Sequence, residues 1–91
     1  MEKAFRVSIV TPLEEVYSGE AVSLIVPAYE GYLGVLANHA PLIAQLVPGK
    51  IILRSSSKEP ALIISKNGGL LEVSDNNVNI ILDSDVAKEG A

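Results

Sequence analysis

Apolar and polar residues alternate along most of this chain with the two-residue period of a half-buried β-strand. Phe5, Val7 and Ile9 alternate with polar residues in a first strand that ends at Thr11-Pro12. The later strands predicted from the pattern are Glu14–Tyr17, Glu20–Val26, Tyr32–Leu36, Leu42–Val47, Lys50–Arg54, Ala61–Lys66, Leu70–Ser74 and Val78–Asp83. Many short strands at regular spacing are typical of an all-β domain.

Short turn sequences separate these predicted strands. Asn67-Gly68 is the strongest hairpin signal, because the tight turns that join antiparallel strands need positive φ angles, which Asn and Gly tolerate. The other predicted turns are Ser18-Gly19, Pro48-Gly49, the exposed loop Ser55–Pro60 and Asp75-Asn76-Asn77. Together, strands and turns predict an all-β fold, a small flattened β-sandwich or barrel of about eight to ten short strands.

The stretch Glu30–Leu42 departs from this regular pattern. It contains two glycines, a proline and the only histidine of the chain, yet it is too apolar for an ordinary loop. Gly31 and Gly34 can take the positive φ angles of a turn or bulge. Pro41 holds the residue before it in an extended conformation. We therefore expect a kinked strand, an irregular corner at His39 and then a second strand.

Composition narrows the possible classes of protein. The 91 residues are enough for one small domain, and one Phe, three Tyr and no Trp predict an aliphatic core. A net charge of −4 argues against nucleic acid or an anionic membrane surface as a direct partner. Cysteine is absent, which excludes disulfides and thiolate metal sites and fits a cytosolic compartment. Apolar runs fall well short of the roughly 20 residues of a membrane helix, so we expect no direct membrane insertion.

Catalytic chemistry finds little support in the residue types. His39 is the only imidazole, and no acid and nucleophile stand in a recognisable triad arrangement with it. Adjacent Glu14 and Glu15 point to opposite faces of a strand and do not form a carboxylate pair. Gly68-Gly69 has no following helix or lysine with which to hold a phosphate. We expect no enzyme activity, no cofactor and no metal site, and a corner role in which the His39 ring nitrogens bond nearby backbone.

A binding module is the class that the residues favour. Several apolar side chains lie at the irregular corner rather than in regular strands, and an apolar patch on a rigid loop is a plausible contact surface. The alternative is that these side chains only fill the open end of a sandwich. A free-standing β-sandwich adaptor or ligand-binding module and, more distantly, a small hydrolase also remain open from the residues alone.

The order Glu-Gly-x-Leu-Gly-x-Leu-x-x-His-Ala-Pro-Leu over Glu30–Leu42 resembles a signature in the amino-terminal domain of the epsilon subunit of F-type ATP synthases. Thr11-Pro12, Tyr17–Glu20 and Gly68–Ser74 accompany it in the same order as in the family. The resemblance extends from Val7 to Asp83 and implies a β-sandwich domain over residues 1–83. Residues 84–91 would then be a short tail, which could begin a helical turn, in place of the helical hairpin with which most of the family continues.

The resemblance also implies a function and a set of contact residues. The family member would be a non-catalytic rotor subunit at the cytoplasmic face of the bacterial plasma membrane, held there through the ATP synthase complex. It would link the gamma subunit to the c-subunit ring, contact the catalytic alpha/beta head indirectly, and so couple proton or sodium-ion translocation to ATP synthesis. The residues implied on the gamma side are Thr11, His39, Leu42, Ile43 and Ala44, and those on the c-ring side are Glu30, Gly31 and Tyr32.

Two departures from the family pattern qualify this expectation. Tyr32 stands where many members carry glutamate, so aromatic packing or a hydroxyl hydrogen bond would have to replace a charged contact with the ring. Leu82–Ala87 imitates the Ile/Leu-Asp-x-x-Arg-Ala motif through which some members bind ATP, but Val86 stands in the place of the arginine. Since no local cation would pair with phosphate, the sequence predicts no ATP binding.

Overall fold

The computed structural model describes residues 3–56, 59–83 and 86–89. Within these residues the chain forms ten β-strands and no helix, so none of its described segments is a helix that could cross a membrane. The strands are β1 (Phe5–Val10), β2 (Glu15–Ala21), β3 (Ser23–Ala28), β4 (Gly31–Val35), β5 (Leu42–Leu46), β6 (Gly49–Arg54), β7 (Ala61–Ser65), β8 (Gly69–Ser74), β9 (Asn77–Leu82) and β10 (Val86–Glu89). The predicted all-β class is confirmed.

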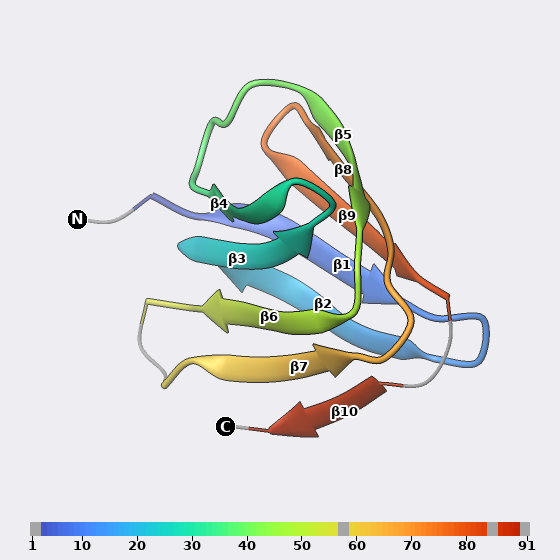
Figure 1. Cartoon of the computed structure of the whole chain (residues 1–91). Coiled ribbons are helices and arrows are strands. Elements are labelled where there is room, and N and C mark those ends of the chain that lie inside the picture. The colour runs from blue at the N-terminus through green and yellow to red at the C-terminus, as the bar shows by residue number, and fades with distance from the viewer. Residues whose placement is uncertain (1–2, 57–58, 84–85, 90–91) are drawn as a thin grey trace.

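All the strands belong to one strongly curled sheet. Their order is β10-β7-β6-β3-β5-β8-β9-β1-β2, and β4 pairs with β3 beside this path. The pairing of β1 with β9 is parallel, and the other pairings are antiparallel. Figure 1 shows the sheet turning back on itself between β3 and β8, so that its two halves enclose the core.

The core is aliphatic, as the composition predicts. Phe5 is the only buried aromatic residue besides the half-buried Tyr17, and the other side chains of the core are Val, Leu, Ile and Ala, while Pro27 and Ser65 are buried outside this cluster. Ile9, Leu71 and Ile80 lie side by side on β1, β8 and β9, and each has an exposed fraction of 0%. Complete burial of one such side chain contributes about 1.5–3 kcal/mol. The alternation found in the sequence therefore marks the inner face of the sheet.

The predicted turn at Ser18-Gly19 is wrong, because both residues lie inside β2 and pair with β1. Gly19 makes room for a neighbouring side chain, since a Cβ at this position would lie 3.3 Å from the hydroxyl oxygen of Tyr17. The chain breaks instead at Val22, whose N–H donates a 2.7 Å hydrogen bond to the carbonyl of Arg54. The single strand predicted over Glu20–Val26 is therefore divided between β2 and β3.

The hairpin predicted at Asn67-Gly68 is also wrong. β7 pairs with β6 and β10, whereas β8 pairs with β5 and β9, so this turn leads the chain from one half of the sheet to the other. Gly68 does have the expected positive φ, at 84°. Its N–H donates to the hydroxyl of Ser65 at 3.0 Å, and its carbonyl accepts from the N–H of Asp83 at 3.0 Å. The residue types correctly indicate a turn here, but the two strands that the turn connects do not pair with each other.

The turn predicted at Asp75-Asn76-Asn77 is confirmed as the connection of β8 to β9. Ser74 pairs with Asn77, so two residues form the turn, and Asn77 already begins β9. Asp75 and Asn76 have φ angles of 54° and 61°. Positive φ at both central residues is the property of a type I′ turn, which matches the twist of the strands it joins.

Two further connections agree with the sequence, and one predicted helical turn does not. The turn at Pro48-Gly49 lies at the junction of β5 and β6, and the loop Ser55–Pro60 joins β6 to β7 as a hairpin; residues 57–58 of that loop lie outside the described residues. The helical turn expected after Asp83 is wrong for Val86–Glu89, which forms β10 on the outer edge of β7. Backbone pairing with β7 supplies the hydrogen bonds that a helix of this length would lack.

Candidate partner-binding surface

The hairpin of β3 and β4 projects from the curled sheet at Tyr29 and Glu30. Ala28 pairs with Gly31, so these two residues form the tip, and both are exposed. The N–H of Tyr29 donates a 2.9 Å hydrogen bond to the carbonyl of Gln45, which fixes the tip against β5. Gly31 takes the positive φ that its sequence position predicts, at 127°, and the expected kink is therefore at the start of the strand.

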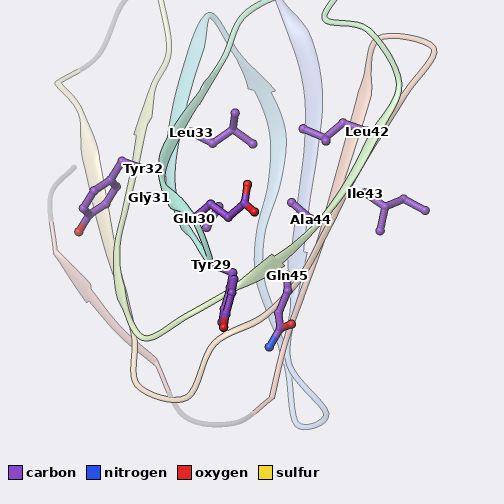
Figure 2. A pocket seen from close by; sticks show the side chains of 10 residues that line it. Tyr29, Glu30, Gly31, Tyr32, Leu33, Leu42, Ile43, Ala44 and Gln45 are labelled. Atoms are coloured by element: carbon purple, nitrogen blue, oxygen red, sulfur yellow. The ribbon is translucent and has the colours of Figure 1, made fainter.

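A shallow groove of about 500 Å³ lies between this hairpin and β5. Figure 2 shows Leu33, Leu42 and Ala44 around its centre, with the carboxylate of Glu30 between them. The other residues that line it are Ala28, Tyr29, Gly31, Tyr32, Ile43 and Gln45. Glu30 is the only charged residue of this lining. The groove brings together six of the eight contact residues expected from the family resemblance.

The three expected residues of β5 divide between two faces. Leu42 and Ala44 are half-buried and pack against the core at the open end of the sheet. Ile43 points away from them and has an exposed fraction of 69%. This division follows from the two-residue period of a strand. A partner would therefore meet Ile43 directly and reach Leu42 and Ala44 only through the groove.

His39 lies in a separate corner next to the turn between β8 and β9. Its Nδ1 donates a 2.7 Å hydrogen bond to the carbonyl of Ala40, which confirms the expected bond of a ring nitrogen to nearby backbone. Asn38 has a φ of 64°, and its N–H donates a 2.7 Å hydrogen bond to Oδ1 of Asn76. The Nδ2 of Asn76 donates to the carbonyl of Ala4 at 3.1 Å. One amide side chain thus joins this corner to the start of the chain.

Thr11 lies away from both the groove and the His39 corner. Its Oγ1 accepts hydrogen bonds of 3.2 Å from the N–H groups of Leu13 and Glu14, and so it shapes the connection of β1 to β2. Thr11 follows the last residue of β1, whereas Ala4, which Asn76 binds, precedes the first. Six strand residues at about 3.3 Å each separate the two ends by roughly 20 Å. The structure does not bring Thr11 together with the other expected residues.

Reasoning from sequence missed several residues of this surface. Tyr29 and Gln45 line the groove, and Tyr29 has an exposed fraction of 72%. Asn76 was expected only as a turn residue, although its side chain fixes the neighbouring corner. The position of Tyr29 opposite β5 depends on pairing between distant strands, which a local pattern does not reveal. Among the described residues, no group of three or more His, Asp or Glu side chains is arranged to hold a metal ion.

Comparison with known proteins agrees with this architecture. Residues 4–88 match the family described as ATP synthase, Delta/Epsilon chain, beta-sandwich domain. The chain belongs to this family. The resemblance stated from the sequence motifs is thereby confirmed, and an adaptor unrelated to ATP synthase is not retained.

Relatives of the chain are named as ATP synthase epsilon chains. One from Leptospira interrogans is 42% identical over 84 residues, which are 92% of this chain and 65% of that relative. One from Chlorobium limicola is 42% identical over 87 residues and is matched over 96% of its own length, with 94% of this chain covered. A relative named as the sodium ion specific epsilon chain of Propionigenium modestum is 38% identical, with 87% of this chain and 56% of the relative covered. The chain thus spans somewhat less than two thirds of the first of these relatives.

Two solved structures share the fold. A chain in the mitochondrial ATP synthase of Euglena gracilis, solved as OSCP, F1 and c-ring, aligns with a TM-score of 0.82 at 21% identity, covering 90% of this chain and 51% of that one. A chain in the central stalk and c-ring of the Tetrahymena thermophila mitochondrial ATP synthase aligns with a TM-score of 0.77 at 20% identity, covering 94% and 67%. At 20–21% sequence identity, this likeness shows a shared fold alone.

Proposed function

We propose that this chain is a non-catalytic rotor subunit of an F-type ATP synthase, which links the gamma subunit to the c-subunit ring. In this role it transmits ring rotation, driven by proton or sodium-ion flow, toward the catalytic alpha/beta head. The observation that supports the proposal is the groove that joins Glu30–Tyr32 to Leu42–Ala44 on one rigid sheet. Membership in a family whose relatives are named ATP synthase epsilon chains supports the same assignment.

The proposed contact with the c-ring is the tip of the β3–β4 hairpin, with Glu30, Gly31 and Tyr32. Tyr32 has an exposed fraction of 63% and is held by a strand rather than a mobile loop. An aromatic ring with few rotatable bonds loses little conformational entropy on binding and offers both an apolar face and a hydroxyl. These properties suit the polar loops of a ring that rotates together with the subunit.

The proposed contact with gamma is formed by Ile43 and the half-buried Leu42 and Ala44, with His39 at the neighbouring corner, and Thr11 would meet gamma separately from them. An exposed Ile beside a groove with an apolar floor is the arrangement in which a partner side chain can be fully desolvated. Through these partners the subunit would lie at the cytoplasmic face of the bacterial plasma membrane without entering the bilayer. Stiffness of the sheet is the property that coupling requires, and the continuous core supplies it.

The test is assembly with gamma and the c-ring of the cognate synthase, followed by affinity purification. Ala44→Glu places a carboxylate in the groove, where desolvation without a partner is costly, so we expect at least about a tenfold loss of gamma binding. Ser18→Glu is the matched control, because it adds the same charge to an exposed position on β2 beside Arg6. Equal binding of gamma by both variants would place the contact elsewhere.

A further inference from the structure

β4 is hydrogen-bonded along one side only. It pairs with β3, and no other strand of the described chain pairs with it. The carbonyl of Pro27 accepts a 2.8 Å hydrogen bond from the N–H of Val47, so the backbone groups of Pro27 point away from β4. Its register partner Tyr32 therefore forms a non-hydrogen-bonded pair with it, and so does Gly34 with Ile25 two residues further along. The N–H and C=O groups of Tyr32 and Gly34 consequently face the open side.

The edge strand β2 carries residues that discourage a further strand, whereas β4 does not, and neither does β5, which pairs on the side away from β8 only through Leu46. β2 has exposed Glu15 and Glu20 and an irregularity in its pairing with β1. Charged residues and bulges at an edge oppose pairing with another chain. Gly31–Val35 contains neither a charge nor a proline, so this edge remains available.

The space above and below β4 is open at its two glycines, where a Cβ would stand perpendicular to the sheet. No atom lies within 4 Å of the position that a Cβ would take on Gly31 or on Gly34. The five residues of β4 extend over about 17 Å at roughly 3.3 Å each. Glu30 lies directly before the strand and is the only charged residue lining the adjoining groove.

We propose that the free edge of β4 binds an extended segment of a partner protein, which joins the sheet as a further strand. In that segment, side chains next to Leu33 and Val35 would share the inner face and would have to be apolar. A side chain opposite Gly34 could be aromatic, because the glycine leaves its own position empty. A basic residue at the end next to Glu30 would complement the single charge.

A synthetic peptide tests this mode of binding without any other ATP synthase subunit, so its result is independent of the rotor role proposed above. The probe is acetyl-Lys-Val-Thr-Val-Phe-Val-amide, and its matched control carries N-methyl groups on the amides that would face β4. Titration of the isotope-labelled chain should slow hydrogen exchange of the Tyr32 and Gly34 amides about tenfold at saturation. The N-methylated peptide should bind at least about tenfold more weakly, since two backbone hydrogen bonds are lost. Equal affinity of the two peptides would overturn the proposal, as would protection confined to β2, β5 or β10.

A pair of variants distinguishes peptide binding at the edge of β4 from binding elsewhere on the hairpin. Gly34→Lys places a charge on the edge strand, and Ile25→Lys places the same charge directly opposite it on β3, which has a strand on both sides. We expect Gly34→Lys to weaken peptide binding about tenfold and Ile25→Lys to change it less than about twofold. Equal weakening would contradict docking at the edge. Sedimentation of the chain alone provides the last outcome, because self-association abolished by Gly34→Lys would make a second copy the occupant and overturn the proposal of a separate partner.

Discussion

The hairpins β8–β9 and β3–β4 have connections of the same length and very different surroundings. β8–β9 has β5 on one side and β1 on the other, and it buries Leu71 and Ile80 completely. β3–β4 has neighbours next to β3 only, and it exposes Tyr29 and Tyr32. Exposed apolar side chains occur on both hairpins, since Leu70 and Ile81 of β8–β9 are also exposed, but the aromatic ones, Tyr29 and Tyr32, lie on β3–β4. If the proposed contacts are correct, stability and partner contact depend on separate parts of one sheet.

The turns of the two hairpins also differ in backbone conformation. Asp75 and Asn76 both take positive φ, as a turn that follows the twist of its strands requires. At the tip of β3–β4, Tyr29 and Glu30 are not among the described residues with positive φ, and Gly31 after them takes this conformation instead. The conformation of the first turn follows the twist of its paired strands, whereas the second turn presents an aromatic and an acidic side chain to solvent.

The largest effect is expected from a cavity in the enclosed hairpin. Leu71→Ala removes a fully buried side chain at the centre of β8, and such changes lower the free energy of unfolding by about 2–5 kcal/mol. Leu70→Ala is the matched control, because Leu70 precedes Leu71 on the same strand and is 44% exposed. Urea unfolding followed by circular dichroism gives both values. Similar losses for the two variants would mean that β8 is not buried on one face.

A smaller loss is expected at the glycine that leads the chain between the two halves of the sheet. Gly68→Val combines a φ of 84° with overlap between the new Cβ and the carbonyl oxygen of Leu46, so we expect a loss of at least about 1–3 kcal/mol. Gly34→Val is the control on the open strand, where no atom lies within 4 Å of the Cβ position. Since β-branched residues favour strands, this control should be neutral or slightly stabilising. An unchanged melting temperature for Gly68→Val would contradict the described corner.

A still smaller loss of stability is expected at Asn76, which joins the enclosed hairpin to the His39 corner. Asn76→Ala removes its hydrogen bonds to Asn38 and Ala4 and places a side chain with a poor preference for a φ of 61°, at a cost of about 1–2 kcal/mol. Asn76→Gly keeps the backbone conformation and removes only the hydrogen bonds. Thermal unfolding of the two variants separates the two causes. If Asn76→Gly were as stable as the parent, the side-chain bonds would contribute nothing.

The sequence predicts this fold well wherever local patterns decide the structure. Alternation identified the inner residues of β1 and β3, and Asp75-Asn76 was recognised as a turn because its residue types tolerate positive φ. The errors at Ser18-Gly19 and Asn67-Gly68 share one cause. In both places the residue types fit a tight turn, but pairing with distant strands determines whether the chain continues, turns or changes from one half of the sheet to the other.

The candidate surface is predictable to a lesser extent for the same reason. The stretch Glu30–Leu42 attracted attention because it is too apolar for an ordinary loop, and the family resemblance added Ile43 and Ala44 and the expected contact roles. The meeting of Glu30–Tyr32 and Leu42–Ala44 in one groove depends on the bond from Tyr29 to Gln45 and on the curl of the sheet, neither of which leaves a local signal. Thr11 belongs to the same family pattern but lies at the far end of β1, so shared occurrence in a motif did not imply proximity.

The smallest effect on stability is expected at two exposed isoleucines, only one of which should have a large effect on binding. Ile43→Ser and Ile81→Ser both replace an exposed side chain, with exposed fractions of 69% and 53%, and each should change the free energy of unfolding by less than about 0.5 kcal/mol. Only Ile43 lines the groove, so Ile43→Ser should weaken capture of gamma about tenfold while Ile81→Ser leaves it within about twofold. The measurement is titration of each purified variant with the cognate gamma subunit. Equal weakening by both would show that gamma lies on the outer face of β9 as well as on β5, and then the division between an enclosed region for stability and an open region for contact would not hold.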